Sequence, residues 1–315
     1  MRAFSSMAVL VLAVAASLSA QAPATGGRGQ NSLFLAPKAT TPAGWIAPNK
    51  PWTRLPELVA KHANETDWTE TIVSDDLLHA DYVSMGPGKK TPRRLNADTR
   101  EWWIVQDGQV RFTIDGVEPF IASKGWLVQV PYRNVYQIET VGDRPSLRFE
   151  VNIANATKMY PLDETPIQVP GKTFVSVRVQ GGKGAYDDLN KPYFDFNDVV
   201  SGKIARAGAF VTDVRGFANM IAGRPQPAPA PADKGHFHEE SGEFWFILWG
   251  QVRFTVETQS TFIANQGDVV YAPKQMWHLA SLAGDGPLSC RVAMNGYPDL
   301  AHSFEPPAAA RGRGR

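Results

Sequence analysis

Cysteine is nearly absent from this 315-residue chain, and a single residue, Cys290, rules out a disulfide within it. The flanking sequence predicts a strand, so we interpret Cys290 as a buried, unreactive thiol. An excess of either positive or negative charge is also lacking. A formal net charge of +1 provides no basic field and argues against a nucleic-acid partner.

Long hydrophobic runs are missing too, which leaves one informative short run at the amino terminus. Arg2 precedes the apolar stretch from Met7 to Leu18, and small residues follow it. This order is typical of a secretory signal peptide, which we place at residues 1–20. The alternative, a membrane anchor, needs ~20 apolar residues, so no membrane insertion is expected after cleavage. We therefore expect a periplasmic or secreted protein, exported unfolded because no twin-arginine pair is present.

Helical periodicity is scarce, and Pro56 to Ala63 is the best candidate for a short helix. Most other segments are short, rich in Val, Phe, Ile and Trp, and bounded by Gly, Pro, Asp or Asn. Such a pattern predicts an all-β sandwich or barrel. The last residues, 301–315, are basic and of low complexity, and we expect a disordered tail.

An internal repeat divides the chain into two copies. The segment "EWWIVQDGQVRFTIDG" from Glu101 matches "EFWFILWGQVRFTVET" from Glu243, 142 residues later. The same offset relates Gly125 to Gly267 and continues through two prolines without a gap. Two copies of one β-domain are the simplest interpretation.

Histidine is rare, with six in the chain, yet three of them and one glutamate stand at suggestive spacing in the second copy. His236 and His238 would share one face of a strand, Glu243 would open the next strand, and His278 would follow later. Three imidazoles and a carboxylate suit Fe, Mn, Co, Cu, Ni or Zn better than Mg or Ca. They would leave one or two positions free on an octahedral ion for substrate or dioxygen. The alternative is a pair of surface histidines beside an unrelated acid.

These residues resemble the two sequence motifs of the cupin superfamily. His236, His238, Glu243 and Gly250 fit the first motif, although its upstream glycine is displaced. The second motif is matched by Gly267, Pro273 and His278, while Gln275 replaces its inner glycine. The resemblance covers both copies and implies an all-β fold of two tandem cupin barrels, the double-stranded β-helix or jelly-roll type. It implies one divalent transition metal per chain (Fe, Mn, Cu, Ni or Zn).

The implied organisation follows the repeat. An amino-terminal extension is expected at 21–80 and a degenerate barrel without metal ligands at 81–155. A connecting segment that completes the barrels is expected at 156–209, and a metal-binding barrel at 210–300.

The first copy has lost the ligands. The offset puts Arg94 where His236 stands, Asn96 at His238 and Tyr136 at His278, while Glu101 keeps the place of Glu243. Arginine is a permanent cation and cannot bind a metal. An Arg94–Glu101 ion pair is expected to fill the vacated site. A structural role for this barrel is favoured, with binding of an anion by Arg94 as the alternative.

Strand alternation from Glu243 directs Trp245 and Ile247 toward the metal side, with Phe244 and Phe246 facing away. Trp245 is therefore our candidate for substrate binding. Core packing is the alternative, and it is supported by Trp103 at the matching position of the metal-free copy.

The resemblance implies a metal-dependent enzyme, and we expect a dioxygenase-type oxidoreductase acting on a small organic, possibly aromatic, molecule. Glu243 would be both a ligand and the catalytic base. Two alternatives stay open: a cupin that binds metal or a small molecule without turnover, and a cupin lyase or isomerase. A monomer or homodimer is expected.

Overall fold

The computed structural model describes residues 35–231 and 233–297. The expected signal peptide at 1–20 and the expected tail at 301–315 therefore lie outside the described residues. From Lys38 onward the described chain belongs to one compact unit.

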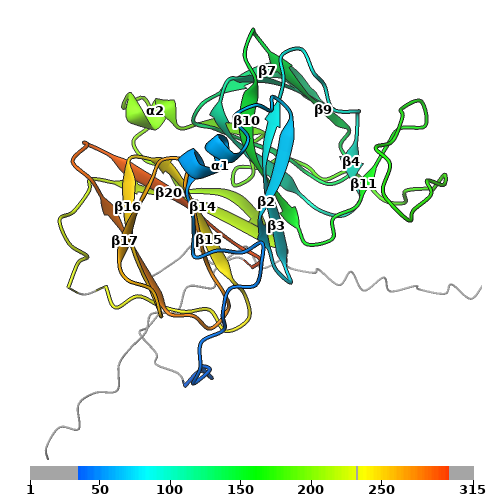
Figure 1. Ribbon diagram of the computed structural model, residues 1–315. Helices are drawn as coiled ribbons and strands as arrows, with labels where there is room; N and C mark the ends of the chain where they lie inside the picture. Colours follow the sequence, from blue (N-terminus) through cyan, green and yellow to red (C-terminus); the bar gives the residue numbers. More distant parts are fainter. Residues whose placement is uncertain (1–34, 232, 298–315) are drawn as a thin grey trace, which may run out of the picture. The chain divides into compact units, whose positions relative to one another are not determined.

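The described chain is almost entirely β, which confirms the predicted fold class. Figure 1 shows the strands of the first copy in cyan and green and most of those of the second in yellow to orange. Up to residue 159 the strands are β1 (Trp52–Thr53), β2 (Trp68–Ser74), β3 (Leu78–Met85), β4 (Leu95–Asn96), β5 (Glu101–Asp107), β6 (Gln109–Ile114), β7 (Val117–Ser123), β8 (Trp126–Val130), β9 (Tyr136–Val141), β10 (Ser146–Ile153) and β11 (Lys158–Met159). The later strands are β12 (Tyr193–Asp195), β13 (Ala209–Asp213), β14 (Gly216–Gly223), β15 (Glu243–Trp249), β16 (Gln251–Val256), β17 (Phe262–Asn265), β18 (Val269–Ala272), β19 (His278–Ala283) and β20 (Ser289–Asn295).

Each copy folds into one six-stranded and one three-stranded antiparallel sheet. The first barrel combines β12-β8-β5-β10-β3-β2 with β7-β6-β9, and the second combines β1-β18-β15-β20-β14-β13 with β17-β16-β19. The strand orders correspond one to one, and β5, β6 and β9 recur as β15, β16 and β19 at the same 142-residue offset. The sequence repeat is thus a structural repeat.

The edge strands are exchanged between the copies. β1, which precedes the first copy, pairs with β18 of the second barrel through Trp52 and Thr53. Reciprocally, β12 precedes the second copy and pairs with β8 of the first barrel. The stretch expected as an amino-terminal extension therefore supplies strands to both barrels, β1 to the second and β2 to the first.

The largest apolar core lies between the two six-stranded sheets. It contains outward-facing aromatic residues of both barrels, with Phe149 and Phe246 in ring contact at 5.3 Å. Two smaller cores fill the barrel interiors, one around Trp103 and one around Trp245. The predicted alternation is confirmed, because Phe244 and Phe246 belong to the shared core while Trp245 and Ile247 face the second barrel's interior.

The described helices are α1 (Leu55–Lys61) and α2 (Asn197–Val200). α1 is the helix predicted around Pro56, which occupies its first turn. Neither helix has the length and hydrophobicity that crossing a bilayer requires, nor does any other helical segment of the described chain. The lone Cys290 is fully buried, as expected, and burial raises the pKa of its thiol.

Candidate metal centre

The structure brings His236, His238, Glu243 and His278 together at one end of the second barrel. One candidate ligand atom from each lies within 4.8 Å of all the others. Glu243 is the first residue of β15 and His278 the first of β19, while the other two histidines precede β15. Three are buried, and His236 is partly exposed at the mouth.

A single carboxylate oxygen, Oε2 of Glu243, faces all three imidazoles. It lies 2.9 Å from Nε2 of His238, 3.0 Å from Nε2 of His278 and 3.6 Å from Nε2 of His236. All three rings therefore present the same nitrogen to one point. Convergence of three imidazole nitrogens and an oxygen is the donor set expected around a transition metal.

The tautomer of His278 supports a cation at this point. Its Nδ1 lies 2.9 Å from the carbonyl oxygen of Met276, which can only accept a hydrogen bond. Nδ1 must therefore carry the proton, and Nε2 of the neutral ring presents a lone pair. That Nε2 is buried and without a hydrogen-bond partner although it faces the carboxylate of Glu243. Two electron-rich atoms at this distance require a positive charge between them, so the residues present fit a metal ion.

The electrostatics keep the ligands in their metal-binding forms. Burial opposes ionisation of Glu243, but the three imidazoles outweigh it and hold the pKa of this carboxyl well below its ordinary value. Burial also lowers the pKa of His278 below 6.5, against the pull of Glu243. A carboxylate beside a neutral imidazole is the combination that a divalent cation stabilises.

The backbone that carries the ligands is the same in both barrels. His236 and His278 form an antiparallel bridge, and so do Arg94 and Tyr136. In the second barrel Gly235 precedes the bridge with φ of 69°, and a Cβ there would lie 2.5 Å from the carbonyl oxygen of His278. The first barrel makes the same bridge with Arg93 at the equivalent position.

Gln275 stands where the second cupin motif has its inner glycine. The residue at this position has a left-handed backbone conformation in both copies. Gln275 has φ of 64°, and Arg133, 142 residues earlier, has φ of 63°. Each donates its backbone N–H to the equivalent carbonyl, that of His238 or Asn96. The departure from the motif therefore leaves the turn intact.

Trp245 lies beside the ligands as an almost fully buried side chain, 2% exposed. Its ring meets that of His278 edge to face at 4.9 Å and that of Phe254 at 5.2 Å. Trp103 packs in the same way on Tyr136 in the first barrel. This contact holds His278 in place, and substrate binding by Trp245 stays a prediction.

The first barrel fills the equivalent space with its own polar side chains. Glu101 accepts hydrogen bonds from Asn96 at 2.8 Å and from the hydroxyl of Tyr136, and it forms an ion pair with Lys158 of β11. Three donors thus occupy the carboxylate that corresponds to Glu243. The ammonium group of Lys158 supplies the positive charge that a metal would otherwise bring.

The prediction that Arg94 forms an ion pair with Glu101 is wrong, because Arg94 pairs with a different glutamate. Arg94 donates to the hydroxyl of Tyr136 at 2.9 Å and forms an ion pair with Glu150 at 3.2 Å. Burial opposes the charge on Arg94, but neighbouring Tyr136 and the glutamates outweigh it and raise the pKa of the guanidinium. Burial likewise lowers the pKa of Lys158, against the pull of Glu101. Lys158 was missed because the repeat offers no counterpart for it among the described residues.

Sequence reasoning also missed Arg291 and Asn295 on β20. The signal is present in the chain, since "SLRFEVN" from Ser146 aligns with "SCRVAMN" from Ser289 once one residue is inserted after the second proline. The fixed offset of 142 hides this match because the true offset there is 143. Strand pairing shows it directly, with Trp103 opposite Glu150 and Trp245 opposite Ala293.

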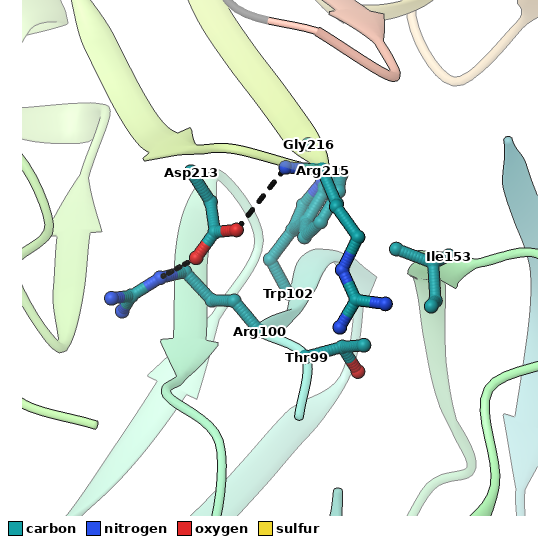
Figure 2. Close-up of a pocket in the computed structure, with 7 residues that line it drawn as sticks. All are labelled: Thr99, Arg100, Trp102, Ile153, Asp213, Arg215 and Gly216. Carbon is teal, nitrogen blue, oxygen red and sulfur yellow. Dashed lines mark hydrogen bonds and ion pairs between the residues drawn. The ribbon is translucent and has the colours of Figure 1, made fainter. Parts of the chain in front are cut away.

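A separate shallow depression lies where residues of both copies meet, and Figure 2 shows its lining. Asp213 pairs with Arg100 at 3.6 Å and accepts the backbone N–H of Arg215. Trp102 packs on Gly216, where a Cβ would lie 2.9 Å from the indole. The guanidinium of Arg215 donates to the backbone carbonyl of Asp98, and none of the four candidate ligands lines this depression.

Comparison with known proteins agrees with this geometry. The family model for the cupin domain matches residues 227–294, which include all four candidate ligands. A search of curated protein sequences found no significant match.

Solved structures resemble most of the chain at low sequence identity. A cupin 2 conserved barrel domain protein from Leptotrichia buccalis is 12% identical with a TM-score of 0.51, covering 78% of this chain and 95% of its own. An oxalate decarboxylase from Bacillus subtilis is 13% identical with a TM-score of 0.48, covering 88% and 89%. A Lactobacillus farciminis oxalate decarboxylase–formate complex is 16% identical with a TM-score of 0.48, covering 85% and 91%. These likenesses concern the fold alone. Residues 227–294 thus match the cupin domain, the barrel that they form repeats the first one, and its His₃Glu cluster is a possible metal site.

Proposed function

We propose that this protein is a metal-dependent enzyme whose second barrel binds one divalent transition metal and acts as a dioxygenase-type oxidoreductase on a small organic molecule. The observation that carries the proposal is the orphaned Nε2 of His278, which shares one buried point with His236, His238 and Glu243. Such a metal would supply Lewis acidity and redox chemistry at the barrel mouth.

The protein's own residues would define how substrate meets that centre. Trp245 packs behind His278 and fixes its ring, while apolar side chains of the second barrel's core keep bulk water from the ligands. Partial exposure of His236 leaves the mouth side as the route of entry. Substrate would therefore approach over His236 and meet the ligand cluster from the open end.

Glu243 would move a proton during the reaction. Its low pKa makes it an anion at neutral pH, so its Oε2 can accept a proton and cannot donate one. Glu243 is the first residue of β15, so its carboxylate lies at the end of the strand beside the three histidines. We assign Glu243 both to the ligand set and to the base.

Substitution Glu243→Gln tests this assignment. Three imidazoles remain, so we expect most of the bound metal to be kept and turnover to fall by roughly 10²–10⁴-fold, the contribution typical of a general base. Metal content is measured by elemental analysis and turnover by oxygen consumption on a panel of catechols, flavonols and small acids. The exposed neighbour Glu240→Gln is the matched control and should leave both unchanged.

The same panel separates the proposal from its rivals. Retained turnover in Glu243→Gln would show that Glu243 is not the general base. Saturable binding without oxygen uptake or product would instead identify a binding protein, and product without oxygen uptake a lyase or isomerase. Export directed by residues 1–20 belongs to this proposal, as does a protein that acts as a monomer or homodimer.

A further inference from the structure

The second barrel has polar groups without partners at positions where the first barrel has paired ones. Strand pairing aligns Arg148 with Arg291 and Asn152 with Asn295, and the residue between them is Glu150 in one barrel and Ala293 in the other. One substitution on an otherwise similar strand therefore removes a buried carboxylate from the second barrel.

Arg291 is the residue that this substitution leaves without a counter-ion. Arg148 forms an ion pair with Glu150 at 3.4 Å, whereas Arg291 has Ala293 beside it on the same face of β20. Nε of Arg291 is buried without a hydrogen-bond partner, and no described carboxylate forms an ion pair with the side chain. Burial lowers the pKa of Arg291, and the charge of Glu243 opposes this most. Arg291 is partly buried, with its Nε buried as that of Arg148 is, and an anion joining it would offset the cost of burying its charge.

Ser241 and Asn295 repeat the contrast close to the candidate ligands. Their counterparts Thr99 and Asn152 hydrogen-bond to each other at 3.0 Å in the first barrel. In the second barrel, Oγ of Ser241 and Oδ1 of Asn295 are buried without partners, with the two residues 2% and 6% exposed. Asn295 lies directly opposite Glu243 in the sheet. Hydrogen-bonding groups are thus available at the ligand end of the strand.

Arg291 and Asn295 lie on the face of β20 that points into the second barrel, the same face as Glu243 and Ile247 of β15. Arg291 and Asn295 are four residues apart, roughly 13 Å along a strand, and the long side chain of arginine can shorten that gap. Between them Ala293 has a small side chain where the first barrel carries Glu150. A planar guanidinium matches a carboxylate better than other anions, because two parallel hydrogen bonds can form.

We propose that Arg291 binds the carboxylate of a small organic acid in the second barrel, with Ser241 and Asn295 hydrogen-bonding its polar groups near the ligand cluster. The proposal names a small organic acid as the substrate class of the site. It rests on the proposed function only in treating that acid as the molecule that reacts. Binding of the acid itself depends on Arg291 and not on turnover. The ligand would replace the missing side chain of Glu150 as the counter-ion.

Calorimetric titration of the full-length protein tests the assignment with matched probes. Benzoate and malonate are compared with benzamide and malonamide, which have similar shapes without the charge, and with inorganic phosphate. The protein is used both metal-free and loaded with Zn(II), which is redox-inert, so that binding is measured without turnover. We expect at least one carboxylate to bind at least 10-fold more tightly than its amide, and more tightly than phosphate.

Three variants connect this binding to the structure. Arg291→Gln should weaken carboxylate binding about 10- to 100-fold, as expected for loss of a charged hydrogen bond. Ala293→Glu recreates the pair of the first barrel and should weaken it similarly while Zn(II) content stays unchanged. The control Arg148→Gln should leave carboxylate binding intact and lower the melting temperature, because Arg148 is buried and paired with Glu150. Arg291→Gln should not lower it, because Arg291 is only partly buried and has no ion-pair partner among the described residues.

Each result decides the proposal. Equal binding of acid and amide, preference for phosphate, absence of carboxylate binding, or full affinity in Arg291→Gln or Ala293→Glu would overturn it. Failure of the protein to take up Zn(II) would contradict the proposed function instead, since the metal-free titration still reports on Arg291.

Discussion

The two barrels share a backbone and differ in how each compensates one buried glutamate. Glu101 and Glu243 open equivalent strands, and each faces the residue that opens β9 or β19. In the first barrel, Asn96, Tyr136 and Lys158 surround the carboxylate with donors. In the second, three imidazoles converge on it, and the Nε2 of His278 has no hydrogen to offer.

The difference teaches that loss of a metal site requires a replacement charge. A buried carboxylate without a cation is strongly destabilising, so the ligands cannot simply disappear from a folded barrel. The first barrel carries the partly buried Lys158 at the glutamate and the buried Arg94 beside it. The first barrel therefore compensates its glutamate with its own side chains, whereas under the proposed function the second barrel uses a metal ion.

The largest expected effect is on the metal affinity of the second barrel. His278→Ala removes a ligand, and we expect metal affinity to fall by more than the roughly 10–100-fold that loss of an outer-shell partner costs. Elemental analysis and competition with a chelator measure the loss. Tyr136→Phe, at the equivalent position of the first barrel, should leave metal content unchanged. Full metal content in His278→Ala would place the metal elsewhere.

A smaller effect concerns stability without metal. Glu101→Gln leaves Lys158 and Arg94 without a full counter-charge, and breaking a buried pair in this way costs about 3–5 kcal/mol of unfolding free energy. Glu243→Gln in the metal-free protein should cost less, because neutral imidazoles need no counter-ion. Urea unfolding of the two metal-free variants measures both changes. Equal losses would show that the two glutamates are compensated alike.

Much of this contrast could be predicted from the sequence. The spacing of three histidines and a glutamate located all four candidate ligands, and the 142-residue offset located their counterparts in the first copy: Arg94, Asn96, Glu101 and Tyr136. Local patterns suffice for such features, because strand alternation and turn residues act over a few positions.

Partners that depend on long-range packing could not be predicted. Lys158 reaches Glu101 from β11, 57 residues along the chain, and no periodicity indicates this contact. Arg94 pairs with Glu150 because Lys158 already occupies Glu101. Exchange of β1 and β12 between the barrels was equally hidden, since short edge strands carry little pattern. The match between Arg148 and Arg291 was hidden because one residue is inserted before Arg291, which a comparison without gaps cannot align.

The smallest expected effect is a pH dependence confined to the first barrel. His79 on β3 forms an ion pair with Asp81 at 3.0 Å, and strand pairing puts Phe217 and Asn219 at the equivalent positions of the second barrel. The Asp81 carboxylate raises the pKa of His79 above 6.5, with burial opposing it. The protonated ring is thus favoured in the folded state, so its stabilisation is complete below pH 6.5 and is lost as the pH rises through the folded pKa.

Because the side chain of His79 is 39% exposed, solvent limits the effect to a few tenths of a kcal/mol. His79→Phe installs the residue of the second barrel and should abolish it. Urea unfolding at roughly pH 6 and pH 8.5, either side of the ordinary histidine pKa, compares the variant with the unmodified protein. The unmodified protein should lose stability relative to His79→Phe at the higher pH. A gain there would reverse the sign and show that His79 is held neutral in the folded barrel.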